Sequence, residues 1–498
     1  MSVPPVIPEP STVTEAGSAS KLDGALLRGM AWTGGVNWLT QVASWGSTMI
    51  VARLLSPEDY GLVGMAGVFL GLVTMLSEFG IGAAVVQLRT LTHEQIAQVN
   101  TLSVAFGVCA FTLSCIAAAP LAAFFNAPQL RWVVVAMSTA FVITSFRTVP
   151  QSLLQRDLRF KRLAFVDGIQ ALILAGLTIC FAALGFRYWT LVLGGVSSAL
   201  MSTALMVYNR PHSFARPRVD SVREALTFSK HIISQRLAWY IYSNADFLVA
   251  GKILGKAALG AYTLAWTLAN VPIEKVTALV VRVTPAIFSS VQNDHAALRR
   301  YLLSLTEGLA LLTFPATFGM ALMADGIVLL LLGEKWRVMI LPLQLLAFYA
   351  SVRSITPLFP LLLNVTGDSS FGARNSFVAA VVLPISFYLG SRWGTAGIAA
   401  AWLVAHPTII VPLYWRVLKR LDLSIWTYLR ALVPAFSGSI LMAIAVLALR
   451  WATPEGMPLI ARVLIPVSGG AATYALVIMT IHGDRMRSFL KILRSARD

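Results

Sequence analysis

The sequence predicts an all-α membrane protein with about fourteen spanning helices. Of its 498 residues, 57% are hydrophobic and only 12% are charged, and the mean hydropathy is +0.74. A soluble domain carries about a quarter charged residues, so water is not the main solvent of this chain. One span needs about 20 apolar residues, and such runs recur along nearly the whole chain. A soluble domain with a single membrane anchor is therefore excluded.

The elements follow from these apolar runs in chain order. Residues 1–25 have little to bury and lack a positively charged start before an apolar run, so we expect a disordered tail rather than a signal peptide. The predicted spans are 26–53, 62–87, 98–123, 132–150, 164–186, 189–208, 228–254, 260–287, 301–323, 339–363, 371–391, 394–415, 431–451 and 459–482.

The basic residues predict the orientation of these spans. An even number of spans places both termini on one side, and Lys and Arg are concentrated in alternate loops, most densely at 156–162 and 210–223. The positive-inside rule then places both termini in the cytoplasm of a multi-pass protein. These loops either bind anionic lipid headgroups or act as orientation signals alone. The net charge of +17 is thus mostly an orientation signal, and nucleic acid is not an expected partner.

An internal repeat predicts two related halves. Segment 51–63 resembles segment 250–262, 199 residues later, so that Arg53 falls on Lys252 and Gly61 on Gly260. We expect each of these glycines to take a backbone conformation that other residues avoid. Six spans separate the copies, which predicts two parallel six-helix lobes. The predicted domains are the first lobe 26–208, a cytoplasmic linker 209–227, the second lobe 228–417, two extra spans in 418–482 and a basic cytoplasmic tail 483–498.

A polar stripe marks one face of the first span. Its members are spaced by three and four residues, and the 199-residue offset gives them counterparts in the seventh span. The stripe is Asn37, Gln41, Ser44 and Thr48, and the counterparts are Arg236, Tyr240, Ser243 and Phe247. Either both faces line a hydrated cavity between the lobes, or they form hydrogen bonds between packed helices. We favour the cavity, because a packed seam prefers small residues to Arg and Tyr.

Ionisable residues lie deep in several spans, where they are costly unless they face protein or water. They are Glu78, Arg236, Asp246, Glu274, Lys275, Arg282, Glu307 and Arg353. The four cations all fall in the second lobe, and a basic patch there suits an anionic substrate such as a phosphate or an acidic sugar. The alternative is neutralisation by Asp246, Glu274 and Glu307 within the bundle.

Catalytic motifs are not found. The sequence shows no zinc helix, nucleophile elbow, phosphate-binding loop or dinucleotide fingerprint, and the three cysteines lack a metal-ligand spacing. No metal or organic cofactor is expected, and the protein is not expected to be an enzyme. Prolines inside the spans, such as Pro272, Pro285, Pro315 and Pro357, predict kinks or hinges.

Several segments resemble the Wzx-type oligosaccharide flippases of the MOP (multidrug/oligosaccharidyl-lipid/polysaccharide) exporter superfamily. They are 29–34 (GMAWTG), 52–62 (ARLLSPEDYGL), 76–84 (LSEFGIGAA), 246–255 (DFLVAGKILG) and 260–262 (GAY). The resemblance implies two six-helix lobes around a cationic cavity, alternating access, and the flipping of a polyprenyl-diphosphate-linked oligosaccharide across the bacterial inner membrane for surface or exopolysaccharide synthesis. The expected partners are this lipid-linked oligosaccharide and the phospholipid bilayer. Other polysaccharide-assembly proteins are further candidate partners. The first lobe departs from the pattern, because only Glu78 and no cation lies deep in it.

The predicted site residues fall into two sets. The substrate-binding set is Asn37, Gln41, Arg236, Tyr240, Lys275, Arg282 and Arg353. The set that couples transport to H⁺ or Na⁺ is Glu78, Asp246, Glu274 and Glu307. Two rival functions remain: a cation or drug antiporter of the same superfamily, whose cavity should be dominated by carboxylates, and a membrane polysaccharide polymerase or ligase, which should have a long catalytic outer loop.

Overall fold

The fold is helical throughout the part of the chain that the structure describes. The computed structural model describes residues 40–77, 82, 85–86, 91–211, 213–216 and 237–483. Eleven helical stretches of these residues are long and apolar enough to cross a membrane. Two of them, Leu237–Ala278 and Ser369–Arg420, each cover two predicted spans, and helix 40–54 covers the described part of the first. Each of the fourteen predicted spans therefore overlaps a helix, which confirms the all-α fold.

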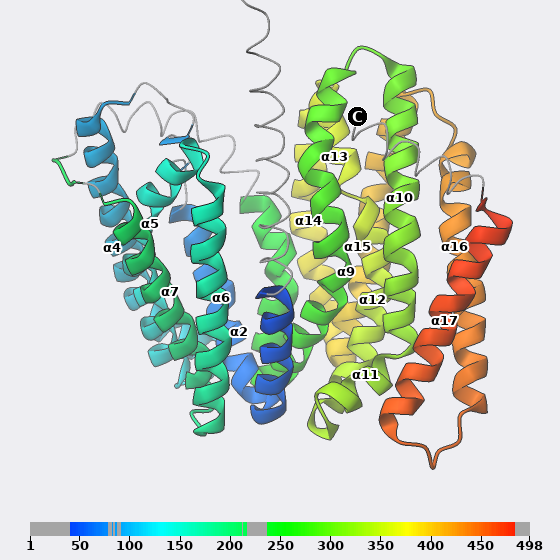
Figure 1. Ribbon diagram of the computed structural model, residues 1–498, viewed down its shortest axis with the longest axis horizontal. Coiled ribbons are helices and arrows are strands. Elements are labelled where there is room, and N and C mark those ends of the chain that lie inside the picture. The colour runs from blue at the N-terminus through cyan, green and yellow to red at the C-terminus, as the bar shows by residue number, and fades with distance from the viewer. Residues whose placement is uncertain are drawn as a thin grey trace, which may run out of the picture.

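The helices form two groups along the chain. The first helix group, within residues 40–209, consists of helix 40–54, α2 (Pro57–Ser77), α4 (His93–Phe124), α5 (Leu130–Arg156), α6 (Phe160–Ala183) and α7 (Trp189–Asn209). Figure 1 shows α4 to α7 on one side of the molecule and α9 to α17 on the other. The predicted tails and most of the predicted linker lie outside the described residues, so the domain limits stay a prediction.

The second helix group comprises the helices of residues 237–483. Its members are helix 237–249, the π-helix η1 (Ala250–Leu254), α9 (Gly255–Ser290), α10 (His295–Leu322), α11 (Ala324–Leu331), the 3₁₀ helix η2 (Glu334–Met339), α12 (Ile340–Ile355), α13 (Leu358–Val365), α14 (Ser369–Gly390), η3 (Ser391–Trp393), α15 (Gly394–Arg420), α16 (Ile425–Ala452) and α17 (Leu459–Ile481). The last two pack on each other at the outer side of this group (Figure 1).

Proline breaks only one of the predicted spans among the described residues. Helix α9 continues through Pro272 and Pro285, and α10 continues through Pro315. The tenth span is instead divided into α12 and α13 at Thr356 and Pro357. A proline inside a helix removes one backbone hydrogen bond, and helices in a membrane tolerate this where neighbours satisfy the freed carbonyl.

The repeated glycines lie where α2 crosses α9. A Cβ atom added to Gly61 would lie 1.7 Å from the carbonyl oxygen of Lys256, and one added to Gly260 would lie 1.8 Å from that of Pro57. The 199-residue offset places Pro57 and Gly61 on Lys256 and Gly260, so this contact has two-fold symmetry. The expectation of an unusual backbone conformation is wrong, since both glycines lie inside regular helices and are needed for close helix packing.

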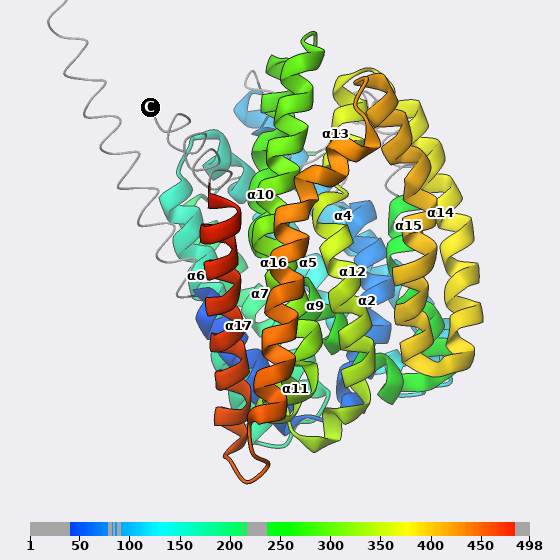
Figure 2. The same ribbon diagram turned by 90° about the vertical axis from the view of Figure 1, so that its right-hand side faces the viewer.

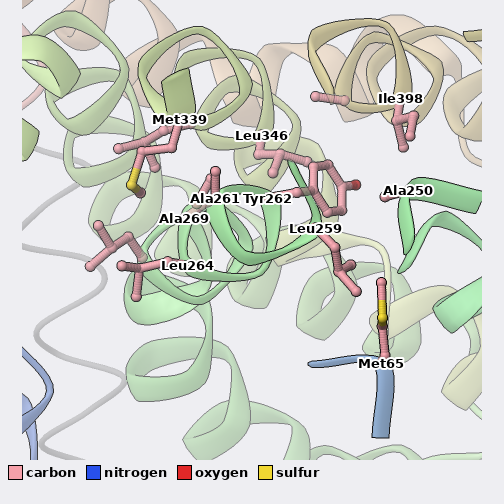
Figure 3. Packing of buried hydrophobic residues seen from close by; sticks show 14 of the residues in the cluster. Met65, Ala250, Leu259, Ala261, Tyr262, Leu264, Ala269, Met339, Leu346 and Ile398 are labelled. Atoms are coloured by element: carbon pink, nitrogen blue, oxygen red, sulfur yellow. The ribbon is translucent and has the colours of Figure 1, made fainter. Parts of the chain in front are cut away.

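One hydrophobic core joins the two helix groups around this crossing. Figure 3 shows Met65 of α2 beside Leu259 and Tyr262 of α9, with Leu346 of α12 and Ile398 of α15 in the same cluster. These five side chains are at most 1% exposed. The two helix groups therefore share one continuous hydrophobic core.

The repeated basic residues each cap a helix of the other group. Arg53 donates from Nε to the carbonyl oxygen of Leu331, the last residue of α11, at 2.9 Å. Lys252 donates to the carbonyl oxygen of Phe124, the last residue of α4. The last carbonyls of a helix lack intrahelical partners and carry partial negative charge, so both contacts are electrostatically favourable. The equivalent contacts of Arg53 and Lys252 thus help to hold the two helix groups together.

Candidate functional site

Two embedded cations lie on neighbouring helices of the second group. Arg353 of α12 is half-buried, donates a hydrogen bond to the side-chain oxygen of Asn270, and places its guanidinium carbon 4.8 Å from the centre of the Trp266 ring. Lys275 of α9 is exposed and donates to the side-chain oxygen of Gln41, across the boundary between the helix groups. Each cation is therefore held by a neutral amide.

Acidic residues do not neutralise these two cations within the described part of the chain. Neither Lys275 nor Arg353 forms an ion pair there. Asp246 is fully buried, and its oxygens accept hydrogen bonds from Tyr262 and Trp402, both at 2.8 Å, and from the backbone of Phe247 at 2.9 Å. The described partners of Asp246 are thus neutral donors, and the positive charges of Lys275 and Arg353 are not paired with this carboxylate.

An aromatic cluster connects Asp246 with Arg353. The Trp402 ring centre lies 5.4 Å from that of Trp266 and 5.2 Å from that of Tyr349. Trp402 thus contacts the Asp246 carboxylate on one side and the ring under the Arg353 guanidinium on the other. A cation over an aromatic face is stabilised by the ring quadrupole, so this cluster orients Arg353. Sequence reasoning missed it, because single aromatic residues in apolar helices have no distinguishing pattern.

One residue of the predicted polar stripe and its repeat counterpart bridge the helix groups at equivalent positions. Gln41 accepts from Lys275 of α9, and its repeat counterpart Tyr240 donates to the carbonyl oxygen of Val68 in α2. Thr48 donates to the carbonyl oxygen of Ser44 at 2.9 Å, within its own helix. For these residues the stripe forms hydrogen bonds within and between helices, as packed spans do. A role of Gln41 and Tyr240 in substrate binding stays a prediction.

Of the other predicted site residues, the structure describes the side chains of only two. Glu274 precedes Lys275 in α9 and is exposed, and Glu307 is half-buried in α10. Arg282 lies in α9, but its side chain is outside the described set. Asn37, Glu78 and Arg236 also lie outside the described residues.

An embedded cation also occurs in the first helix group. Arg147 of α5 donates to Gln170 of α6 and Ser202 of α7, both at 2.8 Å, and its side chain is only 15% exposed. Asp167 of α6 lies 3.6 Å away, and Gln151 accepts a further hydrogen bond at 3.1 Å. The expectation that the first lobe holds no deep cation is therefore wrong. Polar residues four apart in α5 and three apart in α6 were the available signal.

The described residues contain no group of three or more His, Cys, Asp or Glu side chains placed to hold a metal ion. Many spanning helices in two packed groups, with the cations Lys275 and Arg353 on two of them, define a polytopic membrane protein with charged side chains in its spans. The chain belongs to the family described as polysaccharide biosynthesis protein, whose sequence pattern matches residues 50–341.

Individual relatives agree with this family. The chain is 26% identical over 380 residues to the lipopolysaccharide biosynthesis protein WzxC of Escherichia coli (strain K12), an alignment that covers 74% of this chain and 76% of that protein. The lipid II flippase MurJ, in an inward closed conformation, superimposes with a TM-score of 0.72 at 14% identity, over 92% of this chain and 100% of that chain.

A multidrug resistance MATE family transporter of the MOP superfamily, in an inward-facing conformation, gives a TM-score of 0.63 at 15% identity. That match covers 77% of this chain and 95% of the transporter chain. At these identities the two solved structures show the fold alone. The family match and the similarity to WzxC confirm the predicted resemblance to polysaccharide flippases, and the two solved structures confirm the expected fold.

Proposed function

We propose that this protein flips a polyprenyl-diphosphate-linked oligosaccharide from the inner to the outer leaflet of the bacterial inner membrane, for surface or exopolysaccharide synthesis. The observation that carries the proposal is the pair of embedded cations, Lys275 and Arg353, that no described acidic residue neutralises. A sugar diphosphate cannot cross hydrocarbon unaided, whereas its lipid tail never needs to leave it. A polar path for the head alone is therefore sufficient, and a relative named for lipopolysaccharide biosynthesis supports this substrate class.

Each cation has a defined role in this proposal. Lys275 and Arg353 bind the diphosphate by charge-assisted hydrogen bonds, which are about twice as strong as neutral ones. Both cations now donate to amides, Gln41 and Asn270, that an anionic substrate can displace. Because Lys275 and Gln41 belong to different helix groups, substrate binding at Lys275 changes a contact between the groups. Binding is thereby linked to their relative movement.

Asp246 is the coupling residue that the contacts favour. It joins helix 237–249 to α9 through Tyr262 and to α15 through Trp402, so a change in its charge acts on three helices. Its three described partners are hydrogen-bond donors, whereas hard metal cations are bound by several oxygen ligands. We therefore propose a proton rather than a sodium ion as the coupling ion. In this proposal the protein moves the lipid-linked oligosaccharide across the membrane, whereas a polymerase or ligase would join sugar units.

Both termini are placed in the cytoplasm by this proposal, and cysteine labelling tests the orientation. A single cysteine within 156–162 should react with a membrane-impermeant thiol reagent only from the cytoplasm, and one at Lys335 only from the outside. The measurement uses a cysteine-free background in intact cells and in inside-out vesicles. Labelling of both positions from the same face would refute the orientation.

Reconstitution tests the flipping activity directly. Purified protein in vesicles should make a fluorescent polyprenyl-diphosphate oligosaccharide in the inner leaflet accessible to a reagent outside, at a rate well above that of empty vesicles. A fluorescent organic cation in the same vesicles tests the antiporter alternative, which a site containing Lys275 and Arg353 disfavours. Transport of the cation without flipping of the lipid would exclude the proposed function.

A further inference from the structure

A long apolar groove lies between α15 and α16. These helices follow each other in the chain, but α16 packs on α10 and α17, whereas α15 packs on α12 and α14. Figure 2 shows α12 in the space between the ribbons of α16 and α15. The groove between them has a volume of about 920 Å³. This is at the upper end of the range of about 300–1,000 Å³ that is typical of small-molecule sites.

The walls of this groove are exposed apolar side chains. Val411 and Trp415 of α15 are each 61% exposed, and Val433 of α16 is 49% exposed. The floor is formed by Phe314 of α10 and Ile355 of α12, which are largely buried. An apolar channel that is open sideways to hydrocarbon admits a lipid chain without any loss of hydrogen bonds.

One end of the groove carries excess positive charge. Lys419 lines the groove with its ammonium nitrogen 5.0 Å from the centre of the Trp415 ring, and it forms no ion pair with a described acidic residue. Nearby, Arg416 and Arg420 share a single carboxylate, Asp368, at 2.7 and 3.1 Å. The hydrogen bond from Arg416 lowers the pKa of Asp368, so this carboxylate stays charged. The three cations Lys419, Arg416 and Arg420 therefore outnumber the carboxylate of Asp368 at this end, and the excess positive charge attracts a further anion.

The length of the groove matches one leaflet. From Lys419 to Pro407, which line its two ends, α15 rises about 18 Å, and the hydrocarbon of one leaflet is about 15 Å thick. We propose that the groove binds an anionic phospholipid, with an acyl chain along α15 and α16 and the phosphate at Lys419. That this lipid belongs to the cytoplasmic leaflet rests on the orientation in the proposed function, whereas the binding itself does not.

Lipid binding to the purified full-length protein tests this site. Titration with phosphatidylglycerol, phosphatidylcholine and a polyprenyl phosphate, followed by native mass spectrometry, should show preferential retention of phosphatidylglycerol. Lys419→Gln should weaken phosphatidylglycerol binding about fivefold, since one basic residue near a membrane surface contributes about 1 kcal/mol. Val433→Trp should reduce retention of both lipids, because the larger ring occupies the open wall.

The matched control is Arg430→Gln, which removes an exposed cation of α16 that does not line the groove. This variant should retain phosphatidylglycerol as the unaltered protein does. Equal retention of the two lipids, unchanged binding in both groove variants, or preferential retention of a polyprenyl phosphate would each overturn the proposal. None of these readouts requires flipping, so failure of the lipid site is distinguishable from failure of the proposed function.

Discussion

Flipping of the lipid-linked oligosaccharide should fall about tenfold to a hundredfold when Arg353 is replaced by glutamine, and similarly for Lys275→Gln. Each change removes a positive charge that binds the diphosphate, and hydrogen bonds to charged groups are worth about 1.5–3 kcal/mol. The measurement is the flipping rate in vesicles with equal amounts of folded protein. Because both side chains now donate to amides rather than to carboxylates, their loss strands no described acidic residue.

The charge-conserving variants separate substrate binding from packing. Arg353→Lys and Lys275→Arg should keep a substantial part of the activity, because the positive charge stays in place. Equal loss in the charge-conserving and neutral variants, together with a lower yield of folded protein, would instead assign both residues to helix packing.

Gly260→Ala should disrupt the crossing of α2 and α9. The added Cβ atom would lie 1.8 Å from the carbonyl oxygen of Pro57, and neither backbone can move unless the helices separate. Overpacking typically costs about 1–3 kcal/mol, and an overlap with a backbone atom falls at the upper end. We expect a lower thermal midpoint and a smaller folded fraction in detergent, measured by scanning fluorimetry and size-exclusion chromatography.

The control for this change is in the helix that Gly260 contacts. Gly67 lies in α2, and a Cβ atom added there would meet nothing within 4 Å. Gly67→Ala should therefore leave the thermal midpoint unchanged or raise it, since alanine is the better helix former. A similar loss of stability in both variants would show that the close approach is not what makes Gly260 necessary.

The fold could be predicted because the bilayer restricts the choice. A lipid-exposed segment must satisfy its backbone hydrogen bonds internally, so every long apolar run becomes a helix, and counting the runs gives the spans. The repeat could be found because the helix crossing leaves no room for a side chain at Gly61 or Gly260, so both copies have glycine at the same position. Sequence alone did not distinguish this close contact from a turn, because glycine serves both purposes.

The site could be predicted only in part. Charged residues in apolar helices stand out, which is why Lys275, Arg353 and Asp246 were identified from composition. Their partners depend on which helix faces meet, and spacing within one helix does not contain that information. Asp246 thus contacts Trp402, 156 residues away, rather than either cation, and Arg147 gains its partners from α6 and α7.

The symmetric crossing of α2 and α9 has the geometry of a homodimer interface inside one polypeptide. In such an isologous contact each half presents the same groups to the other, as two copies of a single six-span ancestor would. The present halves have diverged at this point, since Glu58 forms an ion pair with Lys256 at 3.0 Å, whereas the equivalent pair would be Ala257 with Pro57. Neither half could form this ion pair with another copy of itself. Divergence of these two positions thus favours pairing of unlike halves over self-association.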